Sequence, residues 1–188
     1  MRRALFTAPR VCAVRRWRSS CGAGDAAEAG LGVGVEVAGV SRAALIKAMM
    51  NHIDMPERFA PSIVHCSVRM ASGPAADDGA LWRSLTYDDG RTVLQHAYAS
   101  PADGEIRFVG LEEGGREGAL EVVNALSSPP GATPRLEHFQ RDRTTLERVH
   151  WAAPRAAVAA AIDATVRLAL AADEAAADLT FHPKEFPS

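Results

Sequence analysis

The sequence predicts an α+β fold in which an antiparallel β-sheet packs against one long C-terminal helix. Between residues 63 and 143, strand-like runs are separated by Gly, Pro and Asp turn signals such as Asp89-Gly90, a pattern typical of consecutive hairpins. From residue 154 to about 172 the chain is rich in alanine, the best helix former, and has a single apolar stripe. A lone helix of this kind must bury its stripe against the sheet.

One strand and two short helices are expected before the hairpins. Valines alternate with other residues at the start of 33–40, which predicts a strand. Ser41 is a good N-cap for a helix over 41–53, where apolar residues recur at helical spacing. Pro56 begins a second short helix, which Pro61 ends.

The strand-like runs then follow in order up to the last helix. Pro154 fits only the first turn of a helix, so the long helix is expected to begin there and to end near residue 172. This order matches the helix-grip fold, in which a curved antiparallel sheet of six or seven strands wraps a long C-terminal helix and encloses a cavity. An ordinary sandwich with a filled core fits the same order. The runs are residues 63–70, 81–89, 92–100, 105–113, 119–128 and 135–143.

The composition sets limits on function. The chain has 188 residues, 47% of them hydrophobic, and a formal net charge of −2, which suits one globular domain with an appendage. No apolar run reaches the ~20 residues that span a bilayer. The chain also lacks a basic domain of the kind that would bind nucleic acid. The three cysteines are too scattered for a disulfide framework: Cys12, Cys21 and Cys66. The sequence has no CxxC pair, so we expect no structural zinc site. The glycines of residues 30–34 lack a dinucleotide-binding pattern, so we expect neither a metal nor a cofactor.

The charge is unevenly distributed along the chain. Residues 1–24 contain six arginines and no acid, which leaves the remaining chain with 15 basic and 23 acidic residues, a net charge of about −8. An arginine-rich, acid-free N-terminus is typical of a transit peptide, for a mitochondrion ahead of a plastid. A disordered basic tail on a cytoplasmic protein is the alternative. We therefore expect a transit-peptide-like segment and linker over 1–32, a ligand-binding domain over 33–173 and a loose tail over 174–188.

One polar residue interrupts the apolar face of a strand. In the stretch "ALEVVNALSS", Asn124 shares the face of Leu120, Val122 and Leu126, because side chains alternate along a strand. A buried polar group without a partner costs roughly 1–3 kcal/mol. Either another group bonds Asn124 or this face lines a cavity.

A charged residue holds the same kind of position on the earlier strand-like run 81–89. Arg83 lies between Leu81 and Leu85, so alternation places it on an inner face. A buried guanidinium needs an acceptor. Arg83 and Asn124 together would grip a carboxylate or carbonyl of an otherwise apolar ligand; alternatively they form structural bonds to the backbone and to a glutamate.

Two histidines are candidate acid–base groups. His96 alternates with Tyr98 and His138 follows an apolar residue by two, and an imidazole titrates near neutral pH. No carboxylate or nucleophile stands at a diagnostic spacing from either, so satisfied core residues are the simpler interpretation. Cys66, between two valines, is expected to be a small core residue.

Three stretches resemble a known family. "SRAALIKAMMNHIDMPERFAPSIVHCSV", "LWRSLTYDDGRTVLQHAY" and "FVGLEE…ALEVVNALSS" look like the AtaL-like branch of the SRPBCC superfamily, which includes START lipid-transfer domains, the birch-pollen allergen and polyketide cyclases. The order of the "PERF" helix, Cys66, Arg83 and the strand with Asn124, within residues 33–172, is the basis of the resemblance. It implies a ligand-binding domain with an apolar cavity.

These observations lead to one functional prediction and one alternative. We expect binding or carriage of a small hydrophobic molecule in an internal cavity, inside an organelle; a cyclase, dehydratase or isomerase using the same cavity is the alternative. A base that faces the cavity and has a carboxylate partner would favour the enzyme. The expected cavity-lining residues are Arg83, Asn124, His96, Tyr98, Phe108, Val122 and Cys66.

Overall fold

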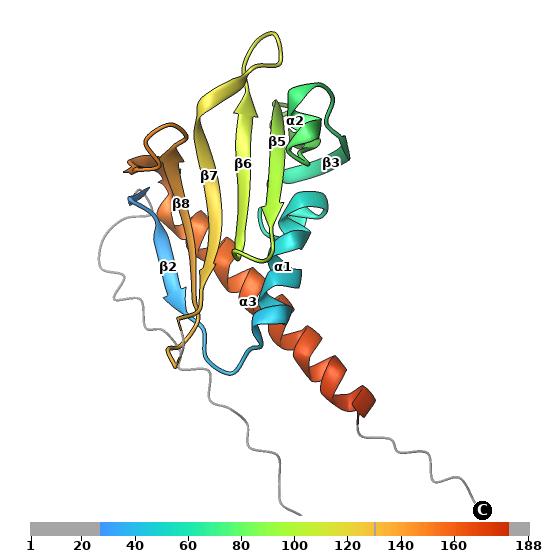
Figure 1. The fold of residues 1–188 in the computed structure, drawn as a ribbon, viewed down its shortest axis with the longest axis vertical. Helices are drawn as coiled ribbons and strands as arrows, with labels where there is room; N and C mark the ends of the chain where they lie inside the picture. Colours follow the sequence, from blue (N-terminus) through green and yellow to red (C-terminus); the bar gives the residue numbers. More distant parts are fainter. Residues whose placement is uncertain (1–26, 130, 181–188) are drawn as a thin grey trace, which may run out of the picture.

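A computed structural model describes residues 27–129 and 131–180 and is organised around one antiparallel sheet (Figure 1). Its strands follow the order β2-β8-β7-β6-β5-β4-β3, and β9 pairs with β8. A second, two-stranded sheet pairs β1 with β10. The strands are β1 Glu28–Gly30, β2 Val33–Glu36, β3 Ile63–Met70, β4 Leu81–Tyr87, β5 Thr92–Ser100, β6 Glu105–Leu111, β7 Glu117–Ser127, β8 Arg135–Asp142, β9 Arg148–Val149 and β10 Trp151–Pro154.

Two helices cover one face of the large sheet. The long helix α3, Arg155–Thr180, runs obliquely behind the sheet, and α1, Arg42–Asp54, packs beside it (Figure 1). A short 3-10 helix, η1, Pro56–Arg58, follows α1 directly. We call the face of the sheet that meets α1 and α3 the concave face and the other the convex face. The convex face is covered in part by the segment with the short helix α2, Pro74–Asp77.

Local sequence explains both long helices. The hydroxyl of Ser41 accepts a hydrogen bond from the amide of Ala44 at 3.1 Å, which caps the first turn of α1. The alanine-rich α3 begins directly after Pro154 and buries one stripe of side chains at helical spacing. That stripe is Val158, Ile162, Thr165 and Ala169.

The main hydrophobic core lies between the concave face and the two helices. Leu45 and Met49 of α1, Ile106 of β6, Leu136 of β8 and Ile162 of α3 are fully buried there. A second, smaller cluster lies on the convex face and includes Tyr98 and Val109. The large sheet is therefore buried in part on both faces.

The predicted α+β, helix-grip arrangement is confirmed: an antiparallel sheet is followed by a single long C-terminal helix that packs on its concave face. The six predicted hairpin strands are all present, with ends that differ by no more than two residues. The first of the two helices after the first strand has 13 residues, so it is not short.

Two predicted domain boundaries were wrong. The expected linker before residue 33 contains β1, which pairs with β10, because Ala29 is buried in the main core. The expected loose tail after residue 173 continues α3 to Thr180, because the alanine-rich composition persists. The transit-peptide prediction falls on residues 1–26, outside the described residues. No helix in the described part of the chain is long and apolar enough to cross a membrane.

Candidate ligand-binding site

Four of the seven predicted site residues lie on the concave face. Residues paired across an antiparallel ladder share a face, and Phe108 pairs with both Ala97 and Val122 within the main core. Arg83 stacks its guanidinium carbon 3.9 Å from the centre of the Phe108 ring. Asn124 lies two residues from Val122 on β7, so it shares that face.

Arg83 fastens the end of α1 to the sheet. Its Nη1 donates a hydrogen bond of 2.6 Å to the carbonyl of His52, and its Nε and Nη2 donate to Oε1 of Gln95 at 2.9 and 2.6 Å. In a continuing helix the carbonyl of His52 would accept from residue 56, but Pro56 has no N–H. Arg83 supplies the missing donor, and a cation at a helix C-terminus is favourable.

The predicted glutamate partner of Arg83 is wrong. Among the residues the structure describes, no acidic side chain forms an ion pair with it, and Gln95 takes that place. Arg83 is 6% exposed, and burial lowers the pKa of its guanidinium to about 10. It remains charged at neutral pH.

Cys66 lies at the margin of the concave face. It pairs with Leu85 across β3 and β4, and its Sγ lies 3.6 Å from the carbonyl oxygen of Ile53, in the last turn of α1. Burial raises the pKa of the thiol. Cys66 therefore supports α1 and is only half-buried.

His96 and Tyr98 do not line the concave face, which corrects the prediction. They pair with Trp82 and Arg107 and alternate with Gln95 and Ala97, so they lie on the convex face. Burial of this face by the α2 segment gives them the apolar surroundings that suggested a cavity.

On the convex face these two residues share one carboxylate. Glu117 accepts a hydrogen bond from Nδ1 of His96 at 2.7 Å and another from the hydroxyl of Tyr98, and it pairs with Arg143. Burial, followed by the Glu117 hydrogen bond, raises the pKa of Tyr98 to about 12. Burial opposes ionisation of Glu117, but the bonds from Tyr98 and His96 and the charge of Arg143 hold its pKa below the usual range. The cluster is a compact ion-pair network.

Three further polar residues, none of them among the predicted cavity-lining residues, are buried on the concave side; one of them, His138, was a predicted acid–base candidate. Nε2 of His52 lies 2.7 Å from the hydroxyl of Thr165 on α3. The His52 ring stacks on Phe59 with centroids 3.6 Å apart and meets the ring of His138 edge-on at 5.3 Å. Burial lowers the pKa of His52 well below its ordinary value and that of His138 to about 3, so both rings are neutral at physiological pH.

Asn124 and His138 are buried polar residues on neighbouring strands. They face each other across β7 and β8, and their exposed fractions are 2% and 3%. Nε2 of His138 is buried without a hydrogen-bond partner. We call Asn124, His138, His52 and Thr165 the internal polar cluster.

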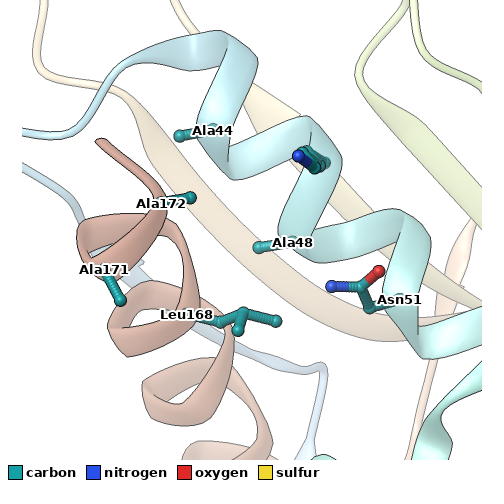
Figure 2. A pocket seen from close by; sticks show the side chains of 7 residues that line it. Ala44, Ala48, Asn51, Leu168, Ala171 and Ala172 are labelled. Atoms are coloured by element: carbon teal, nitrogen blue, oxygen red, sulfur yellow. The ribbon is translucent and has the colours of Figure 1, made fainter. Parts of the chain in front are cut away.

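Two open grooves of about 300 and 310 Å³ flank the C-terminal half of α3. Figure 2 shows the first, where Ala44, Ala48 and Asn51 of α1 face Leu168, Ala171 and Ala172 of α3. The second lies between η1 and α3 and is lined by Arg58, Phe59, Ala164, Arg167, Leu168 and Ala171.

The second groove adjoins the internal polar cluster. Phe59 lines this groove and also stacks on the ring of His52, and Ala164 precedes Thr165 on α3. The Phe59 side chain therefore separates the groove from the cluster.

Comparison with known proteins finds similarity only among solved structures: no family model matches the chain and no curated protein does. The di-domain ARO/CYC StfQ from the steffimycin biosynthetic pathway is 15% identical, with a TM-score of 0.47 over 78% of this chain and 51% of that one. The Zhui aromatase/cyclase from Streptomyces sp. R1128 is 14% identical, with a TM-score of 0.44 over 76% and 92%. The major latex-like protein 151 from Panax ginseng is 12% identical, with a TM-score of 0.40 over 76% and 98%.

These solved structures are helix-grip proteins of the SRPBCC type. This chain spans about half the length of StfQ, and at these identities the likeness concerns the fold alone. The helix-grip architecture of this protein rests on its own strand order and on the packing of α3. Membership of the AtaL-like branch stays a prediction.

Proposed function

We propose that this protein binds a small, largely apolar molecule between the concave face and helices α1 and α3, as a carrier. The observation that supports this most is Nε2 of His138, which is buried without a hydrogen-bond partner opposite the buried Asn124. Buried polar side chains nearly always have a hydrogen-bond partner, so a partner from outside the chain is expected here. A bound ligand supplies that partner.

Apolar contact would provide most of the affinity. Phe108, Val122 and Ile162 lie on or against the concave face, and burying a ligand's apolar surface contributes roughly 25 cal/mol per Å². The groove between η1 and α3 is the route of access in this proposal, with the ring of Phe59 turning aside. A groove of about 310 Å³ lies at the lower end of the ~300–1,000 Å³ typical of ligand sites.

The chemistry of the histidines favours carriage over acid–base catalysis. An efficient general base has a pKa near the working pH, whereas burial lowers the pKa of His138 to about 3 and that of His52 well below its ordinary value. The histidine with a carboxylate partner, His96, lies on the convex face. A cyclase, dehydratase or isomerase remains the alternative proposal for the same region.

Native mass spectrometry of the purified full chain, followed by extraction and identification of small molecules, tests the proposal. We expect a fraction of the protein to retain an apolar molecule, and unliganded protein to take one up from a mixed hydrophobic extract. A chain that emerges free of ligand and takes up nothing from the extract contradicts the proposal.

We further propose that the protein acts in mitochondria. The motivation is the arginine-rich, acid-free composition of residues 1–24. A fusion of residues 1–30 to a fluorescent reporter should enter mitochondria, and replacing its six arginines by glutamine should leave the reporter in the cytosol. A parent fusion that stays diffuse contradicts the targeting proposal, and one that enters plastids redirects it.

A further inference from the structure

We propose that the protein forms a weak, two-fold symmetric dimer in which strand β3 of one copy pairs antiparallel with β3 of a second copy. Such a dimer needs no ligand, so it is independent of the proposed binding function. Three features of β3 lead to it: a free backbone edge, apolar side chains exposed beside that edge, and the fit of two such edges to each other.

The backbone of β3 has a free edge. Among the described strands, β3 lies at the end of the strand order and pairs only with β4 (Figure 1). The amide of Ala71, just after the strand, donates to the carbonyl of Ala80 at 3.1 Å, so it points towards β4. Because backbone groups alternate in direction along an antiparallel strand, those of Cys66, Val68 and Met70 point away from β4, to the free edge.

The side chains beside this edge are apolar and exposed. Val68 and Met70 pair with Arg83 and Leu81, so they lie on the concave side of the sheet. Their exposed fractions are 36% and 65%, and Val64 on the same strand is 61% exposed. Three of the seven large hydrophobic side chains that are exposed in the described part of the chain therefore lie on one strand of eight residues.

The strand also lacks the usual protection of a sheet edge. Natural edge strands avoid other chains through short length, proline, lysine or inward-pointing charges. β3 has eight residues with neither proline nor lysine, and its single arginine, Arg69, stacks over the ring of Trp82 at 4.2 Å. The one irregularity in its pairing with β4 lies at Ile63–His65, which leaves the rest of the strand regular. An edge of this kind is a template for another strand.

A second copy of β3 matches the apolar side chains of this edge. A two-fold axis at Ser67, perpendicular to the sheet, places residues of the same face opposite each other. Val68 then lies opposite the partner's Cys66, and Met70 lies opposite the partner's Val64. All of these side chains are apolar, and each pair occurs twice. The surface is therefore complementary to itself, as a two-fold interface requires.

The same register satisfies the free backbone groups. Cys66 and Val68, whose backbone groups point to the edge, lie opposite each other and form the hydrogen-bonded pairs of an antiparallel ladder. On the convex side, Ser67 meets its own copy and His65 lies opposite the partner's Arg69. At pH 8, above the ordinary histidine pKa of about 6.5, an imidazole does not repel this guanidinium.

The size of the contact predicts a weak dimer. The paired residues are 64–70 of each copy, far fewer than the roughly 20–30 residues that each side of a standard interface contributes. Interfaces of this small size are typical of transient association. We therefore expect a dissociation constant of about 10–100 µM.

Sedimentation velocity of the full chain at pH 8, under reducing conditions and from about 1 to 300 µM, measures the association. We expect the average sedimentation coefficient to rise with concentration from the monomer towards the dimer. Val68→Lys should weaken dimerisation at least about tenfold, because the added charge enters the symmetric interface twice. Leu94→Lys is the matched control: Leu94 is 39% exposed on the convex side of β5, and this variant should dimerise like the parent.

A cysteine at the two-fold axis tests the register. With Cys12 and Cys21 replaced by serine, Ser67→Cys should form an intermolecular disulfide under mild oxidation, because Ser67 meets its copy in a non-hydrogen-bonded pair with Cα atoms about 4.5 Å apart. His65→Cys, on the same face of the strand, is the control. Its copy would lie four residues along the strand, about 13 Å away, so it should stay unlinked. Thermal melts check that every variant is folded.

The outcomes separate the dimer from other uses of the edge. A chain that stays monomeric up to about 300 µM overturns the proposal and leaves the edge to an extended segment of another protein. A dimer that Val68→Lys leaves intact, or that Leu94→Lys weakens equally, overturns the assignment to β3. Cross-linking of His65→Cys as fast as Ser67→Cys overturns the two-fold register. None of these results bears on the proposed ligand binding, which the mass spectrometry tests separately.

Discussion

Replacing Arg83 by methionine should lower the free energy of unfolding by about 2–3 kcal/mol. The variant leaves the His52 carbonyl, which Pro56 cannot bond, without its donor, and an unsatisfied buried carbonyl costs about 1–3 kcal/mol. Loss of the guanidinium from the Phe108 ring removes roughly 0.5–2 kcal/mol more. Gln95 is only half-buried and can bond water, and removal of a buried charge offsets part of the loss.

Urea unfolding followed by tryptophan fluorescence measures this change, and the melting temperature should fall by about 5–10 °C. Arg91→Met is the matched control: its side chain is 64% exposed, so the change should stay within about 0.5 kcal/mol. Arg83→Lys should fall between, because it retains a charge without the forked bonds to Gln95. An Arg83→Met protein as stable as the parent would refute the view that Arg83 fastens α1 to the sheet.

Three further predictions follow from other contacts. Burial lowers the pKa of His138 to about 3, so unfolding takes up a proton below about pH 6.5, and the free energy of unfolding falls by about 1.4 kcal/mol per pH unit between pH 6.5 and 4.5. In His138→Leu the free energy of unfolding should depend less steeply on pH across that range. An unchanged slope contradicts a buried neutral ring. Ser41→Ala should lower the stability measured by thermal melting by about 1–2 kcal/mol, because the Ser41 hydroxyl caps α1 and bonds Asp173 of α3 at 2.8 Å. Ser41→Thr should keep most of that stability. A Ser41→Ala protein as stable as the parent argues against the cap. Tyr98→Phe should cost about 1 kcal/mol through its lost bond to Glu117 and leave affinity for the apolar probe 2-naphthol unchanged, whereas a tenfold loss of affinity would place Tyr98 in the ligand site.

The strands were predictable because turn residues in the local sequence mark where each strand ends. Glycines with positive φ at Gly90 and Gly104 end hairpin strands where the turn signals Asp89-Gly90 and Asp103-Gly104 stand. Alternation then gave the correct grouping of residues on each strand. It gave no information on which group faces the helices.

Strand β5 shows why the face was ambiguous. Leu94, His96 and Tyr98 form one alternating set, while Gln95 and Ala97 belong to the other. Because the α2 segment covers the convex face here, both sets are partly buried, and apolar character does not separate inside from outside.

The internal polar cluster depends on distant contacts. His52 and Thr165 are separated by 113 positions, and each alone reads as one more residue in a helical stripe. The sequence does show that Pro56 leaves the His52 carbonyl without a helical donor. It does not show that Arg83, on a strand beyond the next turn, supplies that donor.

The side-chain amide signals of the two asparagines test the central claim most directly, because the chain contains only Asn51 and Asn124. In an ¹⁵N-labelled protein, Asn124→Leu and Asn51→Leu would assign the two signals, and 2-naphthol would then be titrated in. We predict that the amide of Asn124, inside the internal polar cluster, shifts with saturation while that of Asn51, in the groove of Figure 2, stays in place. A shift of Asn51 with Asn124 unmoved would place the ligand between the helices and contradict a binding site on the concave face.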